Sequence, residues 1–169
     1  MNWHFKSGEI LDEPADVLVC SANVFLNLSG GVGGAILLRC GRGMQDELHA
    51  YLNASGNRFV QPGEVVRTAP WGLPVRAVLH AVAVDGFYGT SIGVVRTTVV
   101  RCLDMAAALD ARRVALTALA TGYGRLRMRD FGAAVAPLRG RAFGTIDDVV
   151  VCVRTEADRD ELASAASPT

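Results

Sequence analysis

The apolar residues of this 169-residue chain form short continuous runs, which polar segments separate. Runs such as AVLHAVAV and VVVCV lack the polar alternation of a strand with one face in water. They therefore predict strands that are covered on both faces. Stretches with this strand character are 3–10, 16–22, 64–70, 77–85, 113–120 and 148–154.

Between these runs, apolar residues recur at steps of three and four, which is typical of amphipathic helices. The clearest case is 91–110, which Ser91 or Thr90 can cap. The segment 32–52 shows the same spacing, but Gly41 and Gly43 are expected to divide it into two helices.

Two further helices are expected near the C-terminus. The shorter one covers 127–138, and the last begins at Thr155, where a hydroxyl precedes a carboxylate at Asp158 in a pattern close to a capping box. Strands alternating with helices predict an α/β protein. The expected architecture is a three-layer α/β/α sandwich around a mixed, mostly parallel sheet of about six strands. We expect one domain over 1–162 and a flexible C-terminal tail over 163–169.

Composition and charge argue against several classes of protein. Acidic and basic side chains balance at 17 each, which argues against a broad nucleic-acid surface. The four cysteines are scattered, so they predict reduced core residues rather than a metal knuckle or a disulfide framework. The N-terminus lacks a basic region followed by an apolar stretch, and no run approaches the roughly 18 apolar residues of a membrane span. A cytoplasmic protein without metal or cofactor is expected.

The segment after the strand 16–22 carries the first candidate site. Asn23 follows the strand, and Gly30, Gly31, Gly33 and Gly34 then open a helix. Bare N–H groups at a helix N-terminus bind phosphate. The alternative is a tight turn that merely precedes a helix. The loop is neither a dinucleotide fingerprint, since Ile36 stands at its third glycine position, nor a Walker loop, since no Gly-Lys-Ser/Thr follows.

A second glycine cluster has the same setting. It follows the strand 113–120, precedes the helix 127–138, and consists of Ala120, Thr121, Gly122, Tyr123 and Gly124. Two such loops at the carboxyl edge of one sheet would suit a diphosphate. Tyr123 would cover a ribose or phosphate in such a site, or else simply pack against the protein.

In these motifs the chain resembles the macro domains that bind ADP-ribose. The matching segments keep the family's order over nearly the whole chain: Gly8-Glu9-Ile10, the strand 16–23 ending in Asn, the loop 30–36, the segment LPVRAVLHAV at 73–82, and the loop 121–124. The resemblance implies the same fold and an ADP-ribose site.

The resemblance also implies roles for individual residues. Glu9 would accept a hydrogen bond from the adenine amino group, and Ile10 would help to hold the base. Asn23, beside Ala22, would bind the hydroxyls of the distal ribose, although a residue of this type also serves as a turn or cap. One phosphate would lie on Gly30, Gly31, Val32, Gly33 and Gly34, and the other on the loop from Ala120 to Gly124.

Departures from the family favour binding over catalysis, so no catalytic residue is assigned. Hydrolytic members of one branch carry an Asp and a His where this chain has Gly33 and Leu37, and Cys20 replaces the first Asn of their strand motif. A positioned acid or base contributes about 10² to 10⁴ in rate. A branch that uses a loop lysine is not matched, because the single lysine is Lys6. A branch that uses consecutive glutamates after the glycine loop is not matched either.

Three other residues have two interpretations each. Cys20 could act as a nucleophile, but a small core residue is the plainer interpretation, and a core role is likewise favoured over a catalytic base for His80. Arg154 stands where the family often stacks an aromatic ring on adenine, so its guanidinium could substitute for that ring.

The sequence thus predicts a module that binds ADP-ribose, either free or as a mono-ADP-ribosyl group on a target macromolecule. One alternative is an ADP-ribosyl hydrolase or ADP-ribose 1''-phosphate phosphatase that uses an oriented water. Another is a degenerate scaffold that kept the fold and lost the ligand. The target and the oligomeric state stay open.

Overall fold

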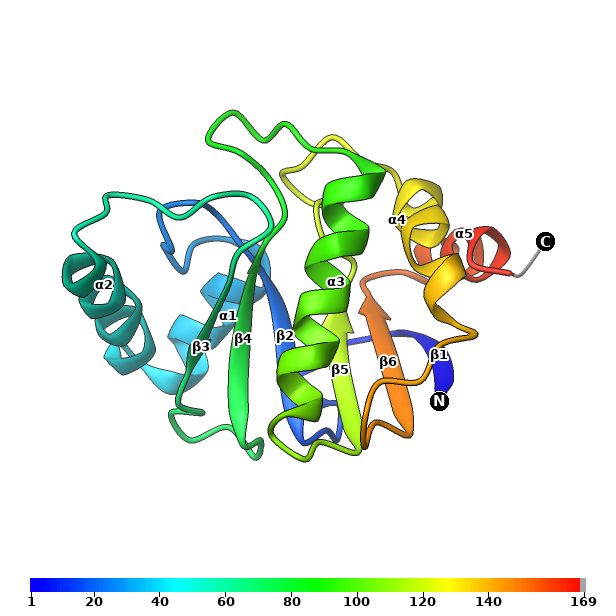
Figure 1. Cartoon of the computed structure of the whole chain (residues 1–169), viewed down its shortest axis with the longest axis horizontal. Coiled ribbons are helices and arrows are strands. Elements are labelled where there is room, and N and C mark those ends of the chain that lie inside the picture. The colour runs from blue at the N-terminus through cyan, green and yellow to red at the C-terminus, as the bar shows by residue number, and fades with distance from the viewer. Residues whose placement is uncertain (168–169) are drawn as a thin grey trace.

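The computed structural model describes residues 1–167 (Figure 1). Its strands are β1 (Asn2–Ser7), β2 (Val17–Ala22), β3 (Val65–Thr68), β4 (Ala77–Val82), β5 (Arg113–Thr117) and β6 (Asp148–Val153). Its helices are α1 (Gly31–Cys40), α2 (Gly43–Ser55), α3 (Ile92–Ala107), α4 (Met128–Val135) and α5 (Glu156–Ala165), with short 3₁₀ turns η1 (Ile10–Asp12) and η2 (Ala136–Leu138).

The strands form one six-stranded sheet in the order β1-β6-β5-β2-β4-β3. Only β3 runs antiparallel to its neighbour, while the other pairs are parallel. This confirms the predicted mixed, mostly parallel sheet. Since five strands share one direction, their carboxyl ends lie at the same edge, which is the upper edge in Figure 1. The loops that leave β2, β4 and β5 start from adjacent positions there.

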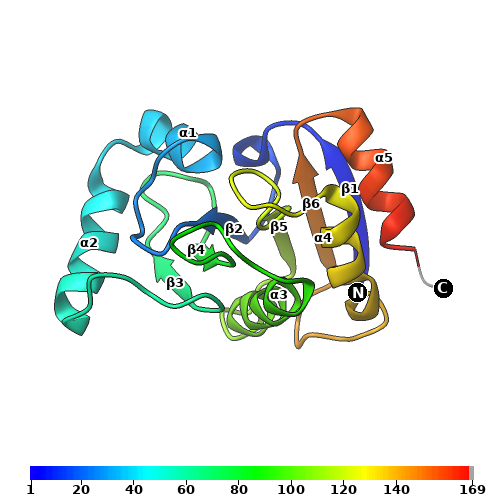
Figure 2. The same ribbon diagram turned by 90° about the horizontal axis from the view of Figure 1, so that it is seen from above.

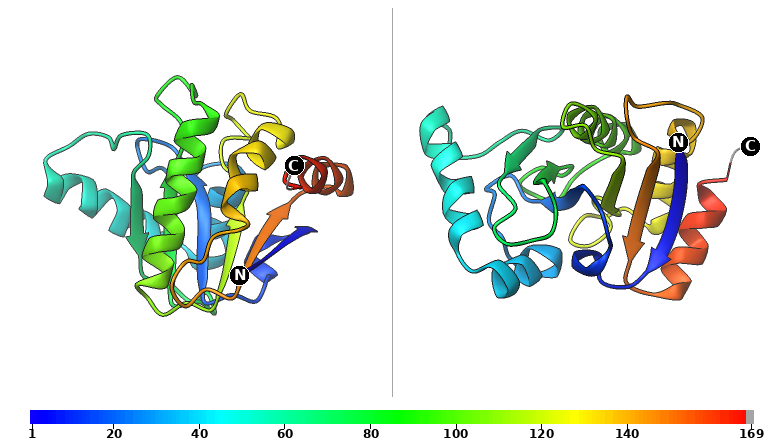
Figure 3. Two further views of the ribbon diagram at one scale, coloured as in Figure 1. Left: turned by 45° about the vertical axis from the view of Figure 1, so that its right-hand side comes forward. Right: turned by 90° about the horizontal axis from the view of Figure 1, so that it is seen from below.

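Helices cover both faces of the sheet, as the continuous apolar runs predicted. Side chains alternate along β2: Val17 and Val19 join a core that α3, α4 and α5 complete, whereas Leu18 and Cys20 join a core with η1, α1 and α2. Figures 2 and 3 show α2 and α5 at opposite ends of the molecule, with α3 along one face. The three-layer α/β/α sandwich is therefore confirmed.

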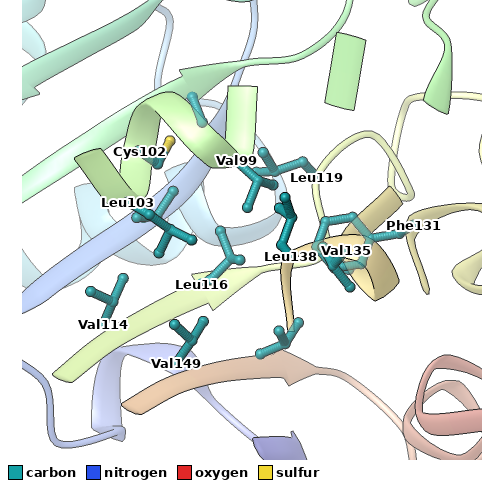
Figure 4. Packing of buried hydrophobic residues seen from close by; sticks show 14 of the residues in the cluster. Val99, Cys102, Leu103, Val114, Leu116, Leu119, Phe131, Val135, Leu138 and Val149 are labelled. Carbon is teal, nitrogen blue, oxygen red and sulfur yellow. The ribbon is translucent and has the colours of Figure 1, made fainter. Parts of the chain in front are cut away.

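The larger core is tightly filled around α3 and α4. Val99 and Leu103 of α3 meet Leu116 of β5, and Phe131 of α4 closes the cluster from the side (Figure 4). All four side chains are essentially inaccessible to solvent. This packing fixes the sheet edge from which the loops emerge.

Several strands end earlier than the apolar runs suggested. The stretch 3–10 forms a strand only to Ser7, and Ile10 begins η1 instead. Likewise 77–85 stops at Val82, and 113–120 stops at Thr117. Beyond these strands, the apolar residues Ile10, Ala83, Val84 and 118–120 are still buried but turn away from the sheet, whereas Gly8, Glu9 and Asp85 are exposed. Apolar character reports burial and not the ladder of hydrogen bonds, so pattern alone overestimated these strands.

The helix starts and breaks predicted from cap residues and glycines agree better with the structure than the strand ends do. The hydroxyl of Ser91 accepts a hydrogen bond from the N–H of Val94 at 3.2 Å, and the Thr155 hydroxyl accepts one from Asp158 at 3.1 Å. The predicted break falls between α1 and α2. The helix expected over 127–138 ends at Val135 and continues as the 3₁₀ turn η2.

The C-terminal boundary needs correction. A tail was expected from residue 163, but α5 continues to Ala165 and Ala166 is fully buried. The guanidinium of Arg139 donates to the Ala166 carbonyl oxygen at 2.8 Å, which holds this end against the domain. The small residues ASAA, taken for a fraying tail, instead let the helix pack closely. Residues 168 and 169 of the expected tail lie outside the described residues.

Two further expectations concern membrane-spanning segments and the state of the cysteines. Through residue 167, no helix combines the length and the apolar character needed to cross a bilayer. All four cysteines lie in this part of the chain, and each is a free thiol.

Asp16 joins three strands at the edge opposite the loops. One of its carboxylate oxygens accepts hydrogen bonds from the backbone N–H groups of Arg112 at 2.8 Å and Arg113 at 3.0 Å. The other lies 3.3 Å from the Arg76 guanidinium. Burial raises the pKa of Asp16, but the hydrogen bonds from Arg113 and Arg112 and the charge of Arg76 outweigh it, so the pKa lies below its ordinary 3.8.

Replacement of Asp16 by Asn should lower the free energy of unfolding at neutral pH by about 1–3 kcal/mol, because a neutral amide cannot replace these charge-assisted bonds. The folded-state pKa is depressed, so the wild-type advantage exists above the unfolded-state value and shrinks as the pH falls below about 4. Urea denaturation across this pH range measures the difference. Asp104→Asn on the exposed side of α3 is the matched control, and equal stability of Asp16→Asn and wild type at neutral pH would contradict this role.

Candidate functional site

The first glycine loop leads directly into the N-terminus of α1. Gly30 is the N-cap residue, with φ of +58°, a conformation that residues with a side chain rarely adopt. No side chain caps this helix. The N–H groups of its first turn have no acceptor within the helix, so they are available to an anion. The phosphate role of this loop stays a prediction.

The second glycine loop, between β5 and α4, folds back on itself. The N–H of Leu126 donates to the Ala120 carbonyl at 3.3 Å. A Cβ at Gly124 would overlap that same carbonyl oxygen, so only glycine fits there. The turn directs the Tyr123 side chain away from its own loop and toward the first glycine loop.

Tyr123 brings the two glycine loops together. A Cβ added to Gly30 would overlap the Tyr123 hydroxyl, so the tyrosine lies directly against the bare backbone of Gly30. The Tyr123 side chain is 71% exposed, which leaves it room to move. Its ring also approaches Tyr88 from the loop after β4, with centroids 5.9 Å apart. Three loops therefore meet above the carboxyl edge of the sheet, as seen from above in Figure 2.

Asn23 organises the loop that links β2 to α1. Its Oδ1 accepts hydrogen bonds from the N–H groups of Phe25 at 3.1 Å and Asn27 at 3.2 Å, and its Nδ2 donates to the Asn27 carbonyl at 2.8 Å. The side chain thus makes the turn that the sequence offered as the alternative role of this residue. Adjacent Ala22 is half-buried at the end of β2.

Gln45 of α2 is a residue that sequence reasoning missed. Its Oε1 accepts from the N–H of Leu28 at 2.6 Å, and its Nε2 donates to the carbonyl of Leu26 at 2.9 Å. The side chain is buried, and Leu26 has a positive φ of 54°, so this amide holds a strained loop in place. The available signal was a polar residue at helical spacing with Leu48 and Leu52 on an otherwise apolar face.

A pocket of about 150 Å³ opens between the loop after β2 and the loop after β4. Its polar lining comes from Asn23, Asn27 and Ser29 on one side and from Asp85 and Tyr88 on the other. Ser29 immediately precedes Gly30, and Tyr88 contacts Tyr123. The pocket is therefore continuous with the glycine loops.

The residues expected at the base end lie at the turn η1. Ile10 is buried in η1, and Glu9 is exposed just before it, with no side-chain hydrogen bond to the turn. Arg154 follows β6, and its Nη2 lies 3.4 Å from where a Cβ of Gly31 would stand. This guanidinium is therefore at the first glycine loop, and the residue before it, Val153, accepts a hydrogen bond from the N–H of Gly8 at 2.9 Å.

The positions that would carry hydrolytic groups are occupied by packing residues. A Cβ at Gly33 would lie 3.2 Å from the Leu28 Cα, so any side chain there would push the preceding loop. Leu37 packs against the core that contains α1 and α2. In the chain up to residue 167, no three His, Cys, Asp or Glu side chains lie close enough together to hold a metal ion.

Cys20 and His80 are neighbours in space, which their sequence positions did not reveal. The Cys20 Sγ lies 3.5 Å from the His80 Nδ1, and the His80 Nε2 lies 3.0 Å from the Thr68 hydroxyl. Burial raises the pKa of Cys20 to about 12 and lowers the pKa of His80 to about 4. Both groups are consequently neutral near pH 7 and inaccessible, in agreement with the core roles expected from the sequence.

Replacement of Gln45 by Ala should lower the free energy of unfolding by about 2 kcal/mol, because it leaves a buried N–H and a buried C=O of the loop without partners. Hydrogen exchange at residues 24–29 should accelerate beyond the global effect. Gln61→Ala, at an exposed position, serves as the control. Unchanged protection of residues 24–29 in Gln45→Ala would show that other contacts hold the loop.

Comparison with known proteins gives a consistent assignment. The family model for the Macro domain matches residues 19–134. An uncharacterized protein of Sulfolobus acidocaldarius is 34% identical over 125 residues, which cover 70% of this chain and 65% of that protein. The O-acetyl-ADP-ribose deacetylase of an Enterobacter species is 32% identical over 120 residues, which cover 69% of this chain and 66% of that protein. The chain therefore spans about two thirds or less of the length of these relatives.

Solved structures show the same fold. The Oceanobacillus iheyensis macrodomain with ADP superimposes with a TM-score of 0.83 at 21% identity, over 95% of this chain and 87% of that one. A Trypanosoma brucei macrodomain in complex with ADP-ribose gives a TM-score of 0.79 at 20% identity, over 98% and 69%. The family model covers more than half of the chain, and the chain belongs to the macro domain family.

Proposed function

We propose that the chain binds ADP-ribose, free or as a mono-ADP-ribosyl group on a macromolecule, in the cleft between its two glycine loops. The observation that carries the proposal is the uncapped N-terminus of α1 at Gly30, which lies directly against Tyr123 of the second loop. Unpaired N–H groups and the positive end of the helix dipole suit a phosphate. A second loop at contact distance suits the second phosphate of a diphosphate.

The surroundings of the loops support an elongated ligand with three parts. Arg154 supplies positive charge beside Gly31, and Glu9 offers an exposed acceptor to an adenine amino group on that side. The pocket near Asn23 includes Ser29, the residue before Gly30, and a second sugar would fit there. The base, the diphosphate and the distal sugar of ADP-ribose thus each have a counterpart among these features.

Names of relatives agree with this assignment. A Trypanosoma brucei macrodomain was solved in complex with ADP-ribose, and the Enterobacter relative is an O-acetyl-ADP-ribose deacetylase. We further propose a cytoplasmic location for this binding activity. Four cysteines without disulfides suit a reducing compartment.

A thermal shift with ADP-ribose tests the binding proposal. Saturation at 100 times the dissociation constant should add about 2.7 kcal/mol of stability, which corresponds to roughly 5–10 °C in Tm for a domain of this size. Gly30→Ala should weaken binding at least about tenfold, or about 1.4 kcal/mol, because its Cβ takes the space of the Tyr123 hydroxyl and favours a different φ.

Gly140→Ala is the matched control for the glycine substitution, since nothing lies within 4 Å of the added Cβ. Wild-type affinity in Gly30→Ala would contradict the phosphate role of this loop. No thermal shift in the wild type would favour the degenerate scaffold.

The second candidate function is hydrolysis of an ADP-ribose ester or phosphate, which the identity to the Enterobacter deacetylase favours. Against it, Gly33 and Leu37 supply neither acid nor base. We expect binding without turnover when O-acetyl-ADP-ribose, ADP-ribose 1''-phosphate or a mono-ADP-ribosylated protein is incubated with the chain. The Enterobacter enzyme is the positive control for the deacetylase assay. Release of ADP-ribose at a rate comparable to that enzyme's would replace the binding proposal with the enzymatic one.

A further inference from the structure

The pocket beside the first glycine loop presents an unassigned carboxylate. Asp85 lies in the loop after β4 and lines the pocket together with Asn23, Asn27 and Ser29. Neither glycine loop contains an acidic residue. Any negative charge that acts on a ligand in this pocket therefore comes from a third loop.

The two oxygens of Asp85 have different tasks. Oδ1 accepts hydrogen bonds from the N–H groups of Phe87 at 2.8 Å and Gly89 at 2.7 Å, and these bonds shape the turn. Oδ2 lies near Gly89 but receives no hydrogen bond from any residue between 1 and 167. Nor does any Lys, Arg or His in this range form an ion pair with Asp85. One anionic oxygen is thus held in position by the turn and left free for a donor.

The amide oxygen of Asn23, by contrast, is already used by the protein. It accepts two backbone N–H groups, and the amide nitrogen donates to the Asn27 carbonyl. If a ligand took over the Asn23 oxygen, two backbone N–H groups of the loop would lose their acceptor, at a cost of about 1–3 kcal/mol each where they are buried. Asn23 consequently positions the loop that carries Ser29 and Gly30, and the second N–H of its Nδ2 remains available as a donor.

We propose that Asp85 selects the distal ribose of ADP-ribose, by accepting hydrogen bonds from its hydroxyls at Oδ2. This inference rests on the proposed function. A ribose diol offers two O–H donors, and a carboxylate oxygen is an acceptor with free lone pairs. Charge-assisted hydrogen bonds of this kind are about twice as strong as neutral ones. The Ser29 hydroxyl on the opposite wall can serve as donor or acceptor to the same sugar.

The substitution Asp85→Asn separates recognition from structure. Asparagine keeps the Oδ1 acceptor for Phe87 and Gly89 and favours the same turn, but it replaces the anionic Oδ2 by an amide nitrogen. Asp85→Ser is the second variant, because a hydroxyl also supports such turns without carrying a charge. Asp104→Asn removes one negative charge from an exposed helix position and is the matched control.

Isothermal titration with ADP-ribose and with ADP tests the proposal, since ADP contains the base and diphosphate but lacks the distal ribose. In Asp85→Asn, the affinity for ADP-ribose should fall about tenfold while the affinity for ADP stays within about twofold of the wild type. Asn23→Ala should instead weaken both ligands together, since it loosens the loop that carries Ser29 and Gly30.

Two results would overturn the assignment. Unchanged ADP-ribose affinity in both Asp85→Asn and Asp85→Ser would show that the carboxylate does not contact the sugar. An equal loss for ADP and ADP-ribose would show that Asp85 acts only through the loop. Failure of the proposed function looks different: wild-type protein that binds neither ligand would reject the ADP-ribose site itself, and with it the role of Asp85.

Discussion

The site depends on the position of β2 at the centre of a parallel arrangement. This strand pairs in parallel with β4 on one side and β5 on the other. Parallel pairing forces the loops that follow all three strands to leave the sheet at the same edge. At the opposite edge, Asp16 bonds to the chain where β4 and β5 begin and fixes their alignment. Residues more than sixty positions apart are brought together in this way.

Loops at such an edge need partners for their backbone groups, and here side chains supply them. Gln45 reaches from α2 to the loop after β2, while Asn23 and Asp85 each accept two N–H groups of their own turns. The three side chains differ in the hydrogen-bonding groups that remain unpaired. Gln45 is buried, and its Oε1 and Nε2 both bond the loop backbone. Asn23 retains one N–H of its amide nitrogen, and Asp85 retains one carboxylate oxygen.

Burial keeps the other potentially reactive groups, Cys20 and His80, uncharged and inaccessible to a substrate. Cys20 and His80 lie within contact distance, a pair that would suggest nucleophilic chemistry in an open cleft. Without access to water, however, the thiol stays protonated and the imidazole stays neutral, because desolvation penalises both charged forms. The same apolar packing places Leu37 and the backbone of Leu28 where a hydrolytic site would need room. The first glycine loop thus presents backbone dipoles beside the Arg154 guanidinium but contains no acid–base pair.

The sequence by itself determined the layers, the sheet type, the helix caps at Ser91 and Thr155, and both glycine loops. These features follow from local rules: uniform apolar runs report burial on two faces, and cap and glycine positions report backbone geometry within a few residues. Only the tertiary structure decided that Tyr123 contacts Gly30, that Arg154 reaches Gly31, that Gln45 holds the loop and that α5 continues beyond residue 163. It also showed that the hydrogen bonds of Asn23 are directed into its own loop and that Asp85 faces the same pocket. Such contacts join segments that are distant in sequence. The polar atoms that remain without a hydrogen bond depend on how all neighbouring backbone groups pair, and that pairing exists only in the folded chain.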